Sequence, residues 1–110
     1  MRKAAIYYKD FLAGILTETD DGDYTFVYDE KYVKNHTKES ISLTMPVRSK
    51  SYTEKRLFPF FEGLIPEGWL LDIASKNWKI NPNDRMGLLL ACCQNCIGAV
   101  SVQPMPNENE

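Results

Sequence analysis

Apolar and polar residues alternate over the first 28 positions in a pattern that predicts three consecutive β-strands. Residues 3–9 and 12–17 are rich in strand-forming side chains, and residues 24–28 alternate large aromatic with smaller side chains. Residues 20–23, Asp-Asp-Gly-Asp, are typical of a tight turn between the second and third strands. We therefore expect an antiparallel meander, in which Gly14 marks close packing or a bulge within the second strand.

The segment after the meander is predicted to hold a short helix, one more strand and a polar loop. Asp29 is placed to cap a helix that runs through residues 31–33, because an aspartate oxygen can accept a backbone N–H of the first turn. Residues 41–45, Ile-Ser-Leu-Thr-Met, alternate apolar and polar side chains and are closed by Pro46, which predicts a fourth strand. We expect residues 48–54 to form a polar loop.

The second half of the chain changes to a helical period. A dense apolar cluster surrounds Pro59, whose missing N–H is tolerated in the first turn of a helix, so a short helix ending near Gly63 is expected. Apolar residues at helical spacing over positions 69–78 predict a second helix. A capping signal at residues 81–84 precedes a third, mostly buried helix over residues 86–92.

Strands followed by helices and one returning strand, at residues 98–102, define the fold class. The pattern predicts an α+β protein with an antiparallel sheet, made of the N-terminal meander plus later strands, and with helices packed on one side. The length of 110 residues fits one domain, which we place at residues 1–103. Residues 104–110 are polar and proline-rich, and we expect a flexible acidic tail.

The charge balance bounds the class of partner. Thirteen basic residues stand against fifteen acidic ones, a formal net charge of -2, and the basic residues form no stripe. This disfavours a third hypothesis, an independent nucleic-acid-binding module. The apolar runs are far shorter than the ~20 residues that span a bilayer, and the N-terminus lacks the features of a signal peptide. We expect a cytoplasmic protein.

Three cysteines, Cys92, Cys93 and Cys96, crowd into five residues. Such spacing cannot form the disulfide framework of a small secreted domain, which favours a reducing compartment. Cys93 and Cys96 form a C-x-x-C pair, so zinc or redox chemistry is an alternative. Reduced and largely buried thiols are favoured over it, and no metal site is predicted.

The chain lacks the motifs of common catalytic machinery. It contains no glycine-rich phosphate loop, no nucleophile elbow and no kinase signature. His36 is the only histidine and lies in a polar segment, which favours a solvated loop over a general base. Glu62 and Glu67 could face each other as an acid–base pair, but surface or capping roles are favoured. We predict no catalytic residue and no cofactor.

A rigid change of chain direction lies beside a tryptophan. Pro66, Glu67 and Gly68 interrupt the helical pattern immediately before Trp69. Tryptophan is enriched among interface anchors because it brings a large contact area for few frozen torsions. From the pattern alone, the inward face of the following helix is the favoured place for Trp69.

The same residues carry a family resemblance. Residues 60–68, Phe-Phe-Glu-Gly-Leu-Ile-Pro-Glu-Gly, resemble the F-F-E-N-L-L-P-E-G motif of the N-terminal domain of HipA-type toxin kinases, with Gly63 replacing the usual Asn and an Ile replacing the second Leu. Residues 41–46 resemble that domain's I-S-L-S-M-P strand. Residues 96–100 resemble its D-C-x-G-A-V ending, where Asn95 replaces the usual Asp. The three motifs occur in the family's order.

The resemblance implies a regulatory role. In the family this domain precedes a larger kinase domain that holds the ATP site, whereas this chain ends soon after the last motif. It is thus similar to the small HipS-type proteins of three-gene toxin–antitoxin systems, which act beside a separate HipT kinase. The resemblance implies a non-catalytic antitoxin that binds and inhibits a HipA- or HipT-type serine/threonine kinase, with a HipB-like DNA-binding protein joining through the complex.

A second hypothesis makes the same chain a structural or activating subunit that completes a split kinase. Both hypotheses need the same docking surface. If the turn presents Trp69 to the kinase cleft, the side chain could obstruct nucleotide binding or the ordering of a catalytic loop. The residues expected to contact the kinase are Trp69, Glu67, Gly68, Pro66, Phe61 and Glu62. Four apolar residues of this region are open to either a core or an interface role: Leu57, Phe60, Phe61 and Leu64.

Overall fold

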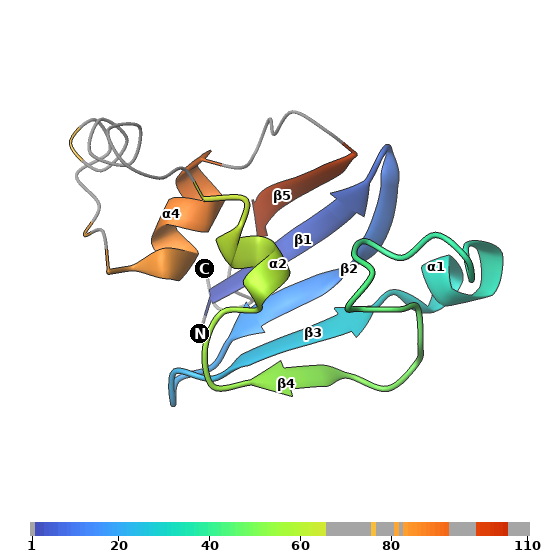
Figure 1. Ribbon diagram of the computed structural model, residues 1–110, viewed down its shortest axis with the longest axis horizontal. Coiled ribbons are helices and arrows are strands. Elements are labelled where there is room, and N and C mark those ends of the chain that lie inside the picture. The colour runs from blue at the N-terminus through green and yellow to red at the C-terminus, as the bar shows by residue number, and fades with distance from the viewer. Residues whose placement is uncertain (1, 66–75, 77–80, 82, 93–98, 106–110) are drawn as a thin grey trace.

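The computed structural model describes residues 2–65, 76, 81, 83–92 and 99–105. In this part of the chain one antiparallel sheet has the strand order β4-β3-β2-β1-β5 (Figure 1). Its strands are β1 (Arg2–Tyr8), β2 (Phe11–Glu18), β3 (Tyr24–Tyr28), β4 (Tyr52–Glu54) and β5 (Val100–Met105). The described helices are α1 (Glu30–Asn35), α2 (Pro59–Glu62) and α4 (Arg85–Cys92). The expected α+β class is confirmed.

The N-terminal meander is confirmed. β1 pairs with β2, and β2 with β3, in consecutive antiparallel ladders. The first connection is a two-residue turn in which Lys9 has a φ of 55°, and the second contains Gly22 with a φ of 88°. Both are left-handed conformations, which tight hairpins require and which glycine adopts without a steric penalty.

Gly14 lies at a tightly packed position of the sheet. The register of β1 against β2 shifts between Ile6 and Tyr7, beside the partner position Gly14. A Cβ at Gly14 would overlap the carbonyl oxygen of Val27 and approach the ring of Phe26 to 2.7 Å. The absence of a side chain therefore makes room for Phe26, and both parts of the expectation for Gly14, close packing and a bulge, are confirmed.

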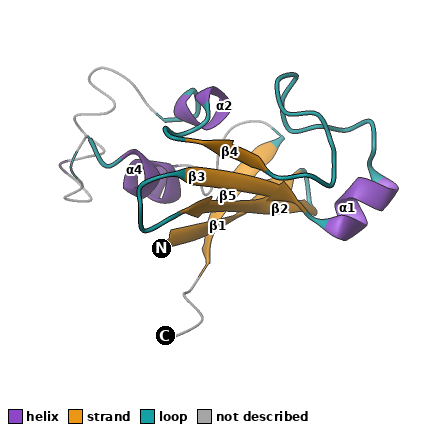
Figure 2. Cartoon of the chain, turned by 90° about the horizontal axis from the view of Figure 1, so that it is seen from below, coloured by secondary structure: helices purple, strands orange, loops and turns teal. Residues whose placement is uncertain are grey.

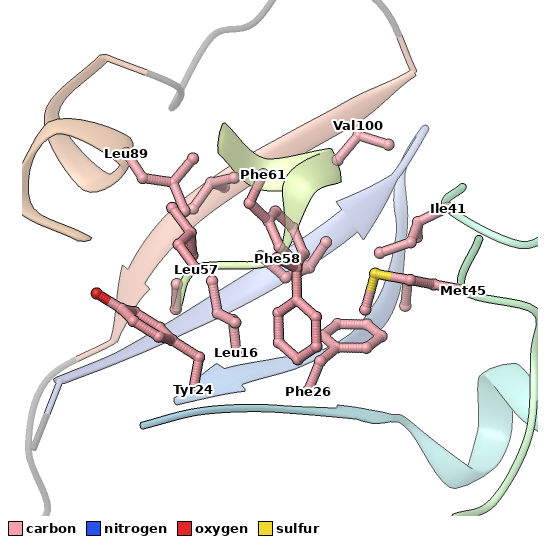
Figure 3. Close-up of a cluster of buried hydrophobic side chains, with 14 of the residues drawn as sticks. Leu16, Tyr24, Phe26, Ile41, Met45, Leu57, Phe58, Phe61, Leu89 and Val100 are labelled. Carbon is pink, nitrogen blue, oxygen red and sulfur yellow. The ribbon is translucent and has the colours of Figure 1, made fainter. Parts of the chain in front are cut away.

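One face of the sheet carries the core. Figure 3 shows Leu16, Tyr24 and Phe26 on the strands, facing Phe58 and Phe61 of the covering layer. Leu16, Phe26 and Phe61 have no exposed surface. The register places these strand residues together, because Leu16 pairs with both Ala4 and Phe26 across the neighbouring strands. Figures 1 and 2 place α1 at one end of the sheet and α4 toward the other.

Two of the expected helices are confirmed in detail. Asp29 precedes α1, and its carboxylate accepts a hydrogen bond from the backbone N–H of Lys31 at 3.1 Å. Pro59 occupies the first turn of α2, and Gly63 follows its last residue. The third expected helix, at residues 86–92, corresponds to α4. The helix predicted over residues 69–78 falls almost entirely outside the described residues.

The prediction of a strand at residues 41–45 is wrong. The segment forms a tight turn in which Met45 N donates to Ser42 O at 3.1 Å, and these two residues form an isolated bridge. Ile41 and Met45 are buried while Leu43 is 99% exposed. The three apolar side chains therefore do not share a face. The alternation of apolar and polar residues arises because Ile41 and Met45 anchor the two sides of a turn in the core.

The edge strands also differ from the prediction. β4 lies within residues 48–54, where a loop was predicted, and pairs with β3 through only three residues. β5 begins later than predicted and continues through Pro104 and Met105, which were assigned to the tail. Pro104 of β5 pairs with Ala4 of β1. β5 is an edge strand with no neighbour on its other side in the described sheet, which is where a proline without an N–H is tolerated.

Gly14→Ala is predicted to lower the free energy of unfolding by about 1–3 kcal/mol, because the added Cβ needs the space of Phe26 and of the neighbouring backbone. Gly63→Ala is the matched control. At Gly63, with a φ of -67°, an added Cβ meets its nearest atoms at 3.5 and 3.6 Å, which is ordinary contact. We expect this variant to gain about 0.4–1 kcal/mol. Urea unfolding of both measures the difference, and equal stability would contradict the packing argument.

Candidate partner-binding site

The predicted contact residues divide into two groups. Pro66, Glu67, Gly68 and Trp69 lie outside the described residues, so their predicted roles are untested. Phe61 and Glu62, predicted together with them from the same motif, are described and belong to α2. The geometry that follows therefore concerns the place where residues 66–69 join the fold.

Phe61 is a core residue. Its side chain is 0% exposed, and its ring centroid lies 5.9 Å from that of Phe26 on β3. The ring centroids of Phe58 and Phe60 lie 6.1 and 5.2 Å from that of Phe61, and both contacts have edge-on geometry. Phe61 is thus packed inside the molecule and has no exposed surface with which to contact a partner.

The neighbouring apolar residues follow the same trend. Leu57 and Ile65 are buried, at 5% and 3% exposure, whereas Phe60 and Leu64 are partly buried against the core. Of the four residues left open between core and interface, Leu57 and Phe61 therefore belong to the core. Buried residues recur along this segment at Leu57, Phe58, Phe61 and Ile65, and Ile65 comes immediately before the Pro66 position.

Glu62 faces outward and joins α2 to α4. Its carboxylate accepts hydrogen bonds from the guanidinium of Arg85, with Nε 3.1 Å from both oxygens and Nη2 2.7 Å from Oε2. The two side chains are 36% and 31% exposed. Planar contacts of this kind give geometric specificity as well as attraction. Arg85 is the first residue of α4, where the helix dipole disfavours a cation, and Glu62 offsets that cost.

Asp84, the residue before Arg85, attaches α4 to the sheet. Arg2 at the start of β1 contacts Asp84 through two hydrogen bonds, of 2.7 and 3.1 Å, and contacts Glu18 at the end of β2 through two more, of 2.7 and 2.9 Å. Asp84 also accepts a hydrogen bond from Gly87 N at 3.1 Å, as an N-cap residue does. This confirms the capping signal predicted at residues 81–84.

Charge and burial shift the protonation of this network. Hydrogen bonds from Arg2 hold the pKa of the Asp84 carboxyl below its usual value. Burial first, and then the charge of Glu18, raise the pKa of Tyr24 to about 12. Tyr24 donates to Glu18 at 3.1 Å, so Asp84, Glu18 and Tyr24 belong to one network around a single cation, the Arg2 guanidinium.

Together, Glu62, Asp84 and Arg85 form a polar stem. Two consecutive residues at the start of α4 contact different partners: the capping residue Asp84 contacts the sheet, and the first helical residue Arg85 contacts α2. The chain between Glu62 and Asp84, which includes residues 66–69, therefore starts and ends at fixed points. The sequence argument placed a cap at residues 81–84 but missed the pairs Arg2–Asp84 and Glu62–Arg85, since partners separated by 82 and 23 residues leave no local pattern.

His36 is packed at the end of α1, and its Nδ1 lies 3.6 Å from Oε2 of Glu39. It follows α1, lies 4.5 Å from Phe11 and 4.8 Å from Tyr32 between ring centroids, and has a side chain that is 20% exposed. The expectation of a solvated loop is wrong, because the imidazole is packed between rings. The residues around it line a surface hollow of about 410 Å³: Phe11, Leu12, Asp29, Lys31, Tyr32, Asn35 and His36.

Other predicted features fall partly outside the description. Cys93 and Cys96 lie outside the described residues, so the C-x-x-C alternative is untested. Within the described ranges, no group of three or more His, Cys, Asp or Glu residues is placed to hold a metal ion. In the same part of the chain no helix has the length and apolar character needed to cross a membrane.

The fold and the stem define a small α+β domain in which polar contacts join α2, the start of α4 and the start of the sheet. A family model of the HipA N-terminal domain matches residues 4–103, and the chain belongs to this family. The solved N-terminal domain of HipA toxin has the same fold, with a TM-score of 0.74 and 24% identity, and the match covers 98% of this chain and 96% of that one.

Two curated relatives differ in length. An uncharacterized protein of Haemophilus influenzae is 32% identical over 96 residues, which covers 87% of this chain and 85% of that protein. The putative kinase Y4mE of Sinorhizobium fredii is 23% identical over 108 residues, which covers 98% of this chain but 26% of the kinase. The chain thus spans about a quarter of Y4mE and most of the Haemophilus protein.

The Glu62–Arg85 pair is predicted to stabilise the fold through a measurable coupling. A double-mutant cycle with Glu62→Gln and Arg85→Gln should give a coupling free energy of about 0.5–1 kcal/mol, since both side chains are about one-third exposed and solvent weakens the attraction. Urea unfolding of the four proteins measures it. Additive effects of the two substitutions would contradict the pair.

The Asp84–Arg2 contact should make stability depend on acid pH. Because the pKa of Asp84 is lower in the folded than in the unfolded chain, its contribution is present above the usual value of 3.8 and is lost as pH falls below it. Asp84→Asn should therefore lower stability at neutral pH and flatten the loss of stability that follows as pH falls below 3.8. Asp21→Asn, in the exposed β2–β3 loop, is the charge-matched control, and an equal flattening there would contradict the assignment.

Proposed function

We propose that this chain is a non-catalytic regulatory subunit that binds a HipA- or HipT-type serine/threonine kinase and holds it inactive, as an antitoxin does. Membership of the HipA N-terminal domain family carries the proposal. The matched region of Y4mE is about a quarter of that protein, which supports a domain that works against a larger body. The Haemophilus relative, of similar length to this chain, supports its working as a separate protein.

The stem supplies a physical basis for inhibition. Residues 66–69 follow the buried residue Ile65 directly, and Glu62 and Arg85 join the two helices at the base of this segment. A segment with fixed ends loses less conformational entropy when it binds than a free chain does. Trp69, delivered from such a base into the kinase cleft, would obstruct nucleotide binding or the ordering of the catalytic loop, because phosphoryl transfer tolerates little displacement of its positioning groups.

In this proposal Glu67, Gly68 and Pro66 shape the approach of Trp69 to the kinase, while Glu62 and Phe61 act indirectly, by positioning the elements that precede it. Glu62 positions the segment through Arg85, and Phe61 positions α2 through its contact with Phe26. A HipB-like DNA-binding protein would join through the kinase and not through this chain. The protein is proposed to act in the cytoplasm, where such a kinase meets its substrates.

The test is phosphorylation by the HipA-type kinase of the same organism, measured with this chain at increasing molar ratios. Autophosphorylation and substrate phosphorylation should fall toward zero near equimolar addition. Trp69→Ala should abolish most of the inhibition while leaving the melting temperature unchanged. Phe11→Ala, an exposed aromatic at the opposite end of the β1–β2 ladder from Arg2, is the matched control and should inhibit as the wild type does.

Three results would overturn parts of the proposal. Increased or unchanged kinase activity would reject inhibition and favour the alternative, a structural or activating subunit of a split kinase. Unfolding of Trp69→Ala would assign this tryptophan to the core. Equal inhibition by folded Trp69→Ala and the wild type would reject its role in the cleft.

A further inference from the structure

The two edges of the sheet differ in length and in charge. Figure 1 shows β4 at one margin of the sheet and β5 at the other. β4 has three residues, includes Glu54 and is followed by Lys55 and Arg56. Short edge strands and charged side chains are devices by which sheets avoid pairing with other chains. β5 has six residues, Val-Ser-Val-Gln-Pro-Met, none of which is charged, and of these devices it has only its proline.

The backbone hydrogen bonds of β5 show which of its groups point away from the sheet. Lys9 N donates to Ala99 O, and this pair continues the register of β1 against β5. In an antiparallel ladder, successive residues of a strand direct their N–H and C=O groups alternately to one side and to the other. The backbone groups of Val100, Val102 and Pro104 therefore point outward.

The position of Pro104 supports this assignment. Pro104 pairs with Ala4 of β1 and has no N–H, yet the strand continues to Met105. A proline at an inward position would remove a hydrogen bond to β1, whereas at an outward position it removes none. The outer edge of β5 thus offers two donors, at Val100 and Val102, and three acceptors. Within the described residues, no strand pairs with this edge.

The side chains of β5 complement those of the same strand run in reverse. Val100 and Val102 are 8% and 0% exposed on the face that carries the core, and Pro104 follows them on that face. Ser101 and Gln103 are partly exposed and lie on the other face. In both directions from Val102, a polar residue comes first and an apolar residue second. Two such strands bring no like charges together, because β5 carries no charge.

We propose that two copies of this chain associate by pairing their β5 strands antiparallel about a two-fold axis at Val102. Val102 and the partner's Val102 then exchange two backbone hydrogen bonds, and the N–H of each Val100 donates to the carbonyl of the partner's Pro104. Pro104 donates no hydrogen bond in return, so the ladder ends there. Ser101 lies beside the partner's Gln103, and the two sheets become one sheet with both covering layers on the same side.

A second copy is the occupant because β5 meets the conditions of a two-fold contact. Such a contact requires one edge to complement itself in hydrogen bonding, in polarity and in charge. A strand from a different protein would not require the pattern around Val102 to be the same in both directions. Residues 100–104 of each copy form the contact, so the interface is small and the dimer should be weak. The proposal does not rest on the proposed function, which concerns another part of the chain.

The test is backbone amide exchange of the full chain, measured by NMR in dilute and in near-millimolar solution. In dilute solution the Val102 amide should exchange much faster than the amides of Ser101 and Gln103, which point to β1. At high concentration its exchange should slow about threefold or more, because dimer formation protects it by mass action. Sedimentation of the same samples should show an equilibrium between monomer and dimer.

Paired lysines test the register of the contact. Ser101→Lys combined with Gln103→Lys should abolish the dimer, because each lysine then faces a lysine of the partner. Mixing this variant with one that carries Ser101→Glu and Gln103→Glu should restore association as a heterodimer. Thr25→Lys combined with Val27→Lys is the matched control, since it adds the same charges at the same spacing to β3, inside the sheet. This control should dimerise as the wild type does.

The other outcomes overturn the proposal. A Val102 amide that exchanges at one rate at all concentrations excludes self-pairing: the edge stays open if the rate is fast, and another part of the same chain covers it if the rate is slow. A dimer that survives the paired lysines has its contact elsewhere. Protection of Val102 that requires addition of the HipA-type kinase would make the kinase, and not a second copy, the occupant of this edge.

Discussion

The contact between Phe61 and Phe26 joins the sheet to the layer that covers it. Both side chains have no exposed surface, and their ring centroids are 5.9 Å apart. α2 has four residues and is far too short to be stable alone, so this packing has to hold it in place. Gly14 makes room for the Phe26 ring, so a missing side chain in β2 is a condition for the placement of a helix more than 40 residues later.

Apolar packing is non-directional, so it does not by itself fix how α4 is oriented against α2 and the sheet. Charged contacts fix that orientation. Arg85 and Asp84 are adjacent, yet one binds α2 and the other binds the start of β1. Partly exposed pairs contribute little free energy each, since solvent screens them. Their geometric effect is larger than their energetic effect, because a helix held by bidentate contacts in two directions cannot rotate without losing one of them.

The sequence predicted the meander and the starts of α1 and α2, because turn residues, caps and two-residue periodicity are local signals. The same periodicity failed at residues 41–45, where the Ser42 hydroxyl binds the backbone of Thr44 and closes a turn in place of a strand. Of the predicted contact residues, Phe61 proved to be core, since motif membership does not reveal which side of a helix a residue faces. The ion pairs of the stem were missed because only the fold brings their members together.

A row of aromatic rings runs from α1 through β3 to α2. Tyr32 stacks on Tyr28 at 5.9 Å, Tyr28 contacts Phe26 at 4.8 Å, and Phe26 contacts Phe61. Tyr28, in the first part of this row, bonds the backbone of the turn that contains Leu43. Phe61, at its end, precedes Glu62 of the stem. A change in the middle should therefore disturb both ends together, because packed rings transmit displacement. A change at the surface of either end should affect that end alone, and this difference distinguishes loss of a contact from loss of its support.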